Sequence, residues 1–147
     1  MTRLPLIALT AAVTPVVAVM LAGVASAETF TVTEPTTFTS PSGNIACAID
    51  SESVRCDIRE RDWSPPARPS SCNENVDYGQ GIRLAAGGQP EFVCAGDTTF
   101  GVGEPLTYGD TIVAGTIECT SEESGVQCSD TEDDGGFTLA REGYDLD

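Results

Sequence analysis

The sequence predicts an all-β fold, namely a small disulfide-stapled sandwich or barrel-like domain built from short strands and hairpins. Several short runs alternate apolar and polar residues with a period of two, and no window of a dozen residues after position 27 shows a helical stripe. Turn signals recur about every 8–12 residues, as in sandwiches and barrels. Six cysteines, an even number, are typical of the disulfide framework of an exported chain.

The first 27 residues predict a signal peptide. Arg3 precedes an apolar stretch, and Ala25-Ser26-Ala27 forms a small-residue cleavage site. The alternative is an uncleaved membrane anchor, because a span needs about 20 residues and the stretch is long enough. Pro5 and Pro15 interrupt the stretch, which is rich in Ala and Thr rather than Leu, and this favours the signal peptide. We therefore expect a secreted or cell-wall-associated protein with no membrane segment in its mature form.

The remaining 120 residues have the length of one domain, which we divide into a mobile Thr-rich lead-in, residues 28–37, and a bridged β-domain, residues 38–147. This part of the chain holds all 23 acidic residues against six Arg, with no Lys and no His, so its net charge is −17. Such a surface repels nucleic acid, anionic lipid and other copies of itself. We expect a monomer that binds neither nucleic acid nor membrane.

A cysteine-bracketed element occurs twice, 72 residues apart. GNIACAIDSESVRC (residues 43–56) and GTIECTSEESGVQC (residues 115–128) share Gly, Ile, Cys, Val and Cys at the same five places. If each element is a hairpin closed by its own bridge, every nearby aliphatic side chain falls on the cysteine face. A slip of one residue would expose that whole face, so the register is well fixed. The aliphatic residues concerned are Ile45, Ile49, Val54 and Ile58 in the first copy, and Ile117 and Val126 in the second.

This argument predicts the bridges Cys47–Cys56 and Cys119–Cys128, and it leaves Cys72 for Cys94. The alternative bridges the two hairpins to each other, in parallel or crossed order. That would need both cysteine faces packed together with Cα atoms within about 7 Å, whereas packed sheets lie about 10 Å apart. Bridges are needed because Val, Ile, Leu and Phe supply only 22 of the 120 residues, a composition otherwise typical of disorder.

The other elements follow from local signals. Alternation predicts strands at residues 30–33 and 136–141, the latter with Phe137 and Leu139 inward. Gly87-Gly88 predicts a turn between two short strands, and residues 106–113 predict a hairpin around Gly109-Asp110. Residues 61–72 are a Pro-rich connector that we expect to be extended and irregular.

Several motifs together resemble a family of small exported actinobacterial domains of unknown function. They are SPSGNI-x-C, VRCDI-x-ERDW-x-PP, YGQG, FVCAGDT, YGDTI-x-AG-x-I-x-C and GFTLARE-x-Y, and they run from about Phe38 to Tyr144. The resemblance implies export, the six-cysteine pattern and one compact domain, and it brings no catalytic residues. Where such domains tend to have a Thr-Gly-His-Gly-Phe-like stretch, this chain has TEDDGGF at residues 131–137, so any role of that His cannot operate here.

Composition argues against an enzyme. A chain without His has no Ser-His-Asp triad and no His ligand for a metal, and bridged cysteines offer no thiolate. Paired carboxylates, as in glycoside hydrolysis, remain, but among 23 acids some pair always lies close. We expect no catalytic residue, no cofactor and no metal.

The acidic turn at residues 130–135 resembles the start of a calcium loop. Asp130, Glu132 and Asp134 stand at positions 1, 3 and 5 and Gly135 at position 6, but position 12 is Arg141 where a bidentate Glu is needed. A solvated acidic turn is therefore the favoured interpretation, with weak calcium binding as the alternative.

One stretch offers a candidate binding surface. Arg55, Arg59 and Arg61 share strand parity and could form a basic stripe for an anionic partner, beside Trp63 as a recognition platform. The alternative is structural: the arginines pair with Asp57, Glu60, Asp62 and the acids of the second hairpin, and Trp63 closes one end of the core. The structural alternative is favoured for both.

The sequence therefore favours a secreted, non-catalytic binding or interaction domain that acts at or outside the cell envelope. An inhibitor of an extracellular enzyme such as a protease is one alternative, since rigid loops lose little entropy on docking. A carboxylate-based hydrolase of envelope glycans and a structural envelope component are the others.

We expect the exported protein to begin at Glu28, because the Ala-Ser-Ala site directs cleavage after Ala27. Intact-mass measurement of the protein from the culture medium checks this directly. Recovery of only the full-length chain, and only from membranes, would support the anchor instead.

Overall fold

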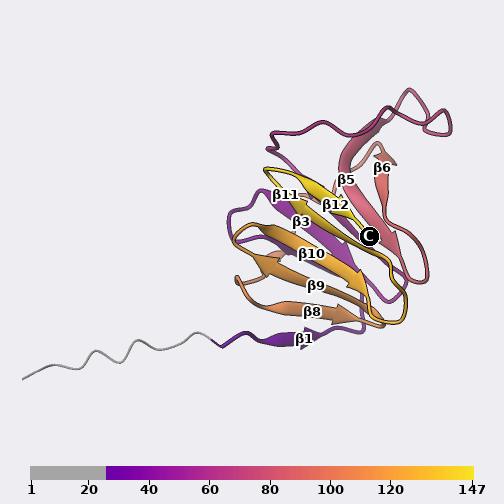
Figure 1. The fold of residues 1–147 in the computed structure, drawn as a ribbon. Coiled ribbons are helices and arrows are strands. Elements are labelled where there is room, and N and C mark those ends of the chain that lie inside the picture. Colours follow the sequence, from indigo (N-terminus) through magenta and orange to yellow (C-terminus); the bar gives the residue numbers. More distant parts are fainter. Residues whose placement is uncertain (1–25) are drawn as a thin grey trace, which may run out of the picture.

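Residues 26–147 are described by a computed structural model, and they form two stacked six-stranded sheets (Figure 1). The first sheet has the order β6 (Glu91–Ala95), β5 (Asp77–Ala85), β4 (Ser53–Ile58), β3 (Ile45–Ile49), β2 (Thr36–Thr39) and β7 (Glu104–Pro105). The second has the order β1 (Thr29–Thr31), β8 (Thr111–Ala114), β9 (Ile117–Glu122), β10 (Gly125–Asp130), β11 (Gly136–Ala140) and β12 (Tyr144–Leu146). The all-β prediction is confirmed. Over these same residues, no helix has the length and apolar character to cross a membrane.

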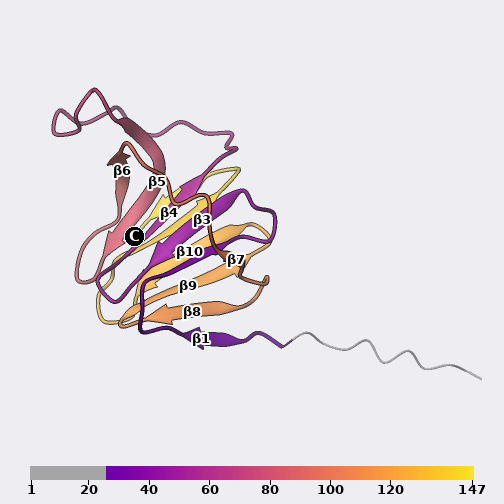
Figure 2. The same cartoon turned by 180° about the vertical axis from the view of Figure 1, so that it is seen from behind.

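The two sheets are built alike. Each contains five antiparallel strands in chain order, β2 to β6 in one and β8 to β12 in the other. A parallel edge strand completes each sheet. β1, which precedes β2 in the chain, pairs with β8 of the second sheet, and β7, which precedes β8, pairs with β2 of the first sheet. Figure 2 shows β1 along the edge beside β8. The sequence repeat is thus the most visible part of a repeated six-strand unit whose first strand joins the opposite sheet.

The repeated hairpins have the predicted register. Ile45, Cys47 and Ile49 face Ile58, Cys56 and Val54, and Cys119 faces Cys128. All three predicted bridges are confirmed: Cys47–Cys56, Cys72–Cys94 and Cys119–Cys128. In both hairpins the bridged Cα atoms lie 4.1 Å apart, so cross-strand neighbours need no rearrangement to bond.

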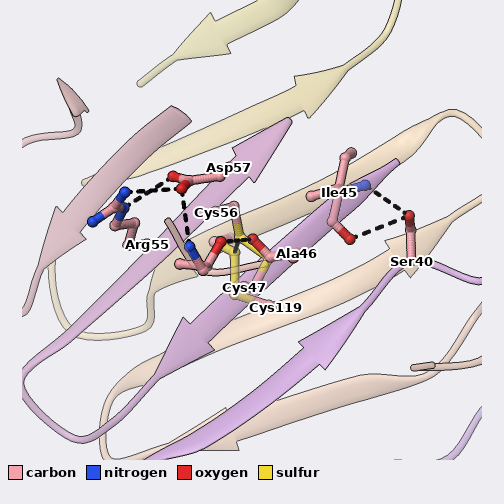
Figure 3. Close-up of a disulfide and its surroundings, with 10 residues drawn as sticks. Ser40, Ile45, Ala46, Cys47, Arg55, Cys56, Asp57 and Cys119 are labelled. Atoms are coloured by element: carbon pink, nitrogen blue, oxygen red, sulfur yellow. Dashed lines mark hydrogen bonds and ion pairs between the residues drawn. A yellow bond between two sulfur atoms is a disulfide. The ribbon is translucent and has the colours of Figure 1, made fainter. Parts of the chain in front are cut away.

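The two cysteine faces nevertheless meet across the sandwich, an arrangement that the sequence argument associated with the alternative pairing. Sγ of Cys56 lies 3.9 Å from Sγ of Cys128, and Figure 3 shows Cys119 beside the Cys47–Cys56 bridge. Each bridge stays within its own hairpin, and the two bridges pack on each other as side chains. The hairpins are therefore covalently separate but share one core.

The core fills the space between the two sheets. Phe137 and Leu139 of β11 point into it, as predicted, with 1% and 0% exposure. Burial of a side chain of this size stabilises the fold by about 1.5–3 kcal/mol. The other large, fully buried aliphatic residues of this core are Ile49, Val54, Ile82, Leu84, Ile117 and Val126. They come from both sheets, so neither sheet buries its apolar face alone.

The predicted hairpin at residues 106–113 is wrong. A turn does form around Gly109, where the Asp110 N–H donates to the Thr107 carbonyl at 3.0 Å. However, the chain before it joins β2, since the Leu106 N–H donates to Thr39 O at 2.9 Å, and the chain after it joins β9. The two flanks of the turn thus pair in different sheets, with β2 and with β9, and not with each other. The turn therefore carries the chain from one sheet to the other.

Residues 28–37, which the sequence set apart as a lead-in, contribute paired strands. Thr29–Thr31 pair with residues 111–113 of β8, and Thr36 and Thr37 pair with Ile49 and Ala48 of β3. The paired part of the chain thus begins at residue 29, because β1 pairs with β8 and β2 pairs with β3. Of the predicted signal peptide, residues 1–25 lie outside the described part.

Gly81 of β5 allows an especially close approach between strands. A Cβ at this position would overlap the Cys56 carbonyl oxygen and the Asp57 carboxylate of β4. We expect Gly81→Ala to lower the free energy of unfolding by about 1–3 kcal/mol, the usual cost of overpacking. Urea unfolding under non-reducing conditions measures this value.

Gly143→Ala is the matched control, since nothing lies within 4 Å of a Cβ placed there. Its effect should stay within about 0.5 kcal/mol. Equal stability of the two variants would contradict the close packing of β4 on β5.

Candidate functional site

A groove of about 460 Å³ lies at one end of the sandwich. Five segments line it: the β2–β3 turn, the chain just after β4, the turn before β8, the β9–β10 turn and the β11–β12 turn. Both sheets contribute, so the groove exists only in the assembled sandwich. We call it the end groove.

The repeat makes the end groove comparable with the opposite end of the sandwich. Gly43 and Gly115 stand at equivalent places, and both have left-handed backbone, with φ of 70° and 61°. A Cβ on Gly115 would lie 3.1 Å from the Cβ of Ser51, whereas a Cβ on Gly43 would meet nothing within 4 Å. The same turn is therefore packed at one end and open at the other.

Further contacts fill the closed end. The Gly87 N–H donates to Oδ2 of Asp130 at 2.7 Å, and the Thr131 N–H donates to the Thr116 carbonyl at 2.8 Å. A Cβ on Gly135 would overlap the Gly88 carbonyl oxygen. These contacts hold the turns at this end of the sandwich against one another.

The walls of the end groove are held by internal contacts. Asn44 donates through Nδ2 to the Glu60 carbonyl at 2.9 Å, and its Oδ1 accepts from the Glu60 N–H at 2.8 Å. Arg141 then contacts the Glu60 carboxylate at 3.1 Å and the Asp62 carboxylate at 3.5 Å. Ser40 Oγ accepts from the Ile45 N–H at 3.1 Å at the base of the β2–β3 turn (Figure 3). The groove is thus preformed.

The chemistry of the groove lining is polar with one exposed aromatic ring. Hydroxyl and amide groups come from Ser40, Ser42, Ser124 and Asn44, and Tyr108 is 38% exposed. Two arginines, at positions 59 and 141, stand against four glutamates, at positions 60, 122, 123 and 142. The local charge is therefore negative, which favours neutral or cationic polar ligands over anions.

The structure does not bring the predicted arginines into one stripe. Because β4 ends at Ile58, only Arg55 lies on the strand. The Arg59 guanidinium lies 4.2 Å from the Phe100 ring centroid, and that of Arg61 lies 4.7 Å from the Trp63 ring centroid. Of the four predicted residues, only Arg59 lines the end groove.

Trp63 contributes to the core. Its ring packs against Tyr144 and Phe92 at centroid distances of 4.8 and 6.1 Å, and its Nε1–H donates to the Ala140 carbonyl at 2.8 Å. Arg61 covers this ring and donates to the Gly79 carbonyl. This corresponds to the structural interpretation favoured for Trp63, since its donor is satisfied and its ring is partly covered.

A buried carboxylate, Asp57, lies on the outer face of the first sheet, and the sequence analysis named it only as one of the acids with which the arginines could pair. Asp57 is 1% exposed, and Arg55 donates to both of its oxygens, at 2.9 and 2.8 Å (Figure 3). The Thr99 N–H also donates to Oδ2, at 3.1 Å, and the Thr99 hydroxyl donates to the Ala46 carbonyl at 2.6 Å. These contacts clamp residues 97–100 over the strands. The only sequence signal was an arginine two places before an aspartate on a predicted outward face.

Arg55 also ties down the exposed end of this segment. Its Nη1 lies 2.6 Å from Oδ1 of Asp97, and its Nη2 donates to the Asp97 carbonyl at 2.8 Å. Burial lowers the pKa of Arg55, but its hydrogen bonds to Asp57 and Asp97 outweigh this, so the pKa lies above the usual value. The hydrogen bond from Arg55 lowers the pKa of the Asp97 carboxyl. Both carboxylates thus pair with the same guanidinium, which holds residues 97–100 against β4.

The acidic turn after β10 is organised by backbone donors. Asp130 accepts from the Gly87 N–H through Oδ2 and from the Glu132 N–H through Oδ1, at 2.7 and 3.1 Å. Arg141, at the position where a calcium loop needs its last ligand, contacts Glu60. Within residues 26–147 no group of three or more His, Cys, Asp or Glu is placed to hold a metal ion.

These features define a class of protein: a two-sheet β-domain with a bridged hairpin at the centre of each sheet and one open end. The chain matches a family of unknown function, DUF6636, over residues 15–146, and it belongs to that family. No curated protein and no solved structure matches the chain.

The stability of the fold should fall in acid partly through Asp130. Hydrogen bonds from the Gly87 and Glu132 N–H groups lower the pKa of this carboxyl below its ordinary value. Because the pKa of Asp130 is lower in the folded than in the unfolded chain, its ionised carboxylate stabilises the fold. This stabilisation is fully present above the pKa in the unfolded chain, about 3.9, and is lost as the pH falls through the lower pKa of the folded chain. We therefore expect Asp130→Asn to lower the melting temperature at neutral pH, with the deficit shrinking below about pH 4.

Melting curves of the wild type, Asp130→Asn and Asp134→Asn between pH 7 and pH 2 provide the measurement. Asp134 is exposed in the same turn, so its variant should follow the wild type. A constant offset for Asp130→Asn at every pH would contradict an electrostatic contribution.

Proposed function

We propose that this protein is an exported binding domain that acts at or outside the cell envelope, and that the end groove is its ligand-binding site. Three disulfides indicate an oxidising, extracytoplasmic environment. The predicted signal peptide, residues 1–27, also supports export from the cytoplasm.

The observation that carries this proposal is the difference between the two ends of the sandwich. The repeat places the same glycine turn at both ends, yet Ser51 packs on Gly115 at one end and nothing packs on Gly43 at the other. A groove of about 460 Å³ is within the range of small-molecule and peptide sites. Because its walls are fixed by Asn44 and Arg141, binding would order few side chains.

The lining favours a neutral or cationic ligand rich in hydrogen-bonding groups. Serine hydroxyls, Asn44 and glutamate carboxylates can pair with hydroxyl, amide or ammonium groups, and the Tyr108 ring offers a stacking surface. Envelope glycans and basic peptide segments both have this chemistry. Anionic polymers fit poorly, because the local and overall charges are negative.

Two alternatives share the same groove. Its glutamates could support a carboxylate-based glycan hydrolase, for which two carboxyl groups must flank a bond. The rigid turns around it could instead enter the cleft of an extracellular enzyme as an inhibitor. The binding role is preferred because it requires only the preformed, polar hollow.

A titration of the ¹⁵N-labelled exported protein tests the proposal, with chito-oligosaccharides, muropeptides and an arginine-rich peptide as probes. We expect one class of probe to shift the amide signals of the groove turns, including Ser42, Asn44 and Ser124. Tyr108→Ala should weaken that binding about tenfold or more, since exposed aromatic residues often anchor ligands.

Phe30→Ala is the control, because Phe30 is similarly exposed, at 44%, but lies outside the groove. Shifts elsewhere on the surface, or none with any probe at millimolar concentration, would contradict the site. Cleavage of a glycan probe during the titration would support the hydrolase.

A further inference from the structure

The segment around the predicted cleavage site lies against a buried acid. The backbone nitrogen of Glu28 donates to Oδ1 of Asp110 at 2.8 Å, and the Thr111 N–H donates back to the Glu28 carbonyl at the same distance. Asp110 is only 7% exposed. The backbone of Asp110 is fixed in turn, since its N–H donates to Thr107 O and its carbonyl accepts from the Ser121 N–H, each at 3.0 Å.

The residues on the other side of this contact are accessible. Ser26 and Ala27 are exposed, and Ala27 lies at the predicted end of the signal peptide. An envelope peptidase would break the C–N bond between Ala27 and Glu28 by adding one water molecule. Ala27 would leave with a carboxylate, and Glu28 would keep the nitrogen as an amine that takes up a proton at neutral pH.

We propose that Asp110 is the receptor for the amino terminus created by this cleavage. The nitrogen that donates a neutral hydrogen bond while Ala27 is attached becomes an α-ammonium group at the same place, facing the same carboxylate. A hydrogen bond with charge on both partners is shorter and about twice as strong as a neutral one. Export processing therefore strengthens the contact without moving any strand.

This ion pair lies at the edge of the second sheet, where it affects the attachment of β1. Glu28 directly precedes β1, which pairs with β8 over only three residues and closes the edge of the second sheet. So short a parallel strand has few hydrogen bonds of its own to hold it. The ion pair holds the residue directly before β1, so cleavage strengthens the attachment of this sheet edge.

The amino-acid composition allows the new α-amine to be labelled selectively. The sequence contains no Lys, so the α-amine is the only primary amine in the mature protein. An amine-selective acylating ester therefore reports on this one nitrogen. The proposal rests on the export that the proposed function includes, but it does not depend on ligand binding in the end groove.

The experiment expresses the full chain with its own leader in an export-competent host, and intact mass confirms the first residue. A second form carries Gly-Ser inserted between Ala27 and Glu28, which keeps the neutral amide opposite Asp110. We expect the native form to melt about 3–6 °C higher than the extended form. This difference should vanish in the Asp110→Asn background, while Asp133→Asn, at an exposed position, should retain it.

Acylation kinetics give a second, independent measurement. At neutral pH the folded native protein should react about tenfold more slowly than Asp110→Asn, because the carboxylate disfavours the reactive neutral amine. If Asp110→Asn fails to fold, the native protein in concentrated urea serves as the fast reference. A first residue other than Glu28, equal melting of native and extended forms, or acylation as fast in the folded as in the unfolded chain would each overturn the proposal.

Discussion

The contact between two disulfides at the centre of the sandwich is the interaction on which the rest of the fold depends. Cys56 and Cys128 touch across the interface at 3.9 Å, and the four cysteines of the repeated hairpins are 0–1% exposed. A chain with so few aliphatic residues uses sulfur as core material, because a cystine is polarizable, apolar and compact. Each bridge also restricts the unfolded chain, which typically stabilises a domain by about 2–4 kcal/mol. Packing and cross-linking thus come from the same atoms.

Around this centre, arginine side chains hold the irregular segments between the strands in place. Arg68, for example, donates to the Asn73 and Val76 carbonyls within the long connector between β4 and β5. Arg55 clamps residues 97–100, and Arg61 covers Trp63. In a chain of net charge −16, these cations act mainly as local donors inside the fold. The surface left to solvent is correspondingly acidic.

The elements that could be predicted from the sequence are those in which apolar and polar residues alternate. Alternation around Cys47 and Cys119 predicted two hairpins, their register and their bridges, because a slip of one residue would expose a whole apolar face. Alternation predicted a strand at residues 30–33, which overlaps β1, but β1 and β7 have only three and two residues, too few to identify their partner strands. Their crossing between sheets therefore could not be predicted. The end groove was invisible for a related reason: it is assembled from five turns that only the completed sandwich brings together.

The exchange of edge strands makes each half of the chain incomplete without the other. A fragment holding only the first half would contain β1 to β6, yet its own β1 belongs on a sheet that this fragment lacks. Two copies of such a fragment could supply each other's missing edge and stack their cystines face to face, as a symmetric dimer with interchanged first strands. The present single chain has the connectivity that results when two such copies become one polypeptide. Each half of the chain thus depends on the other for an edge strand as well as for the opposite side of its core.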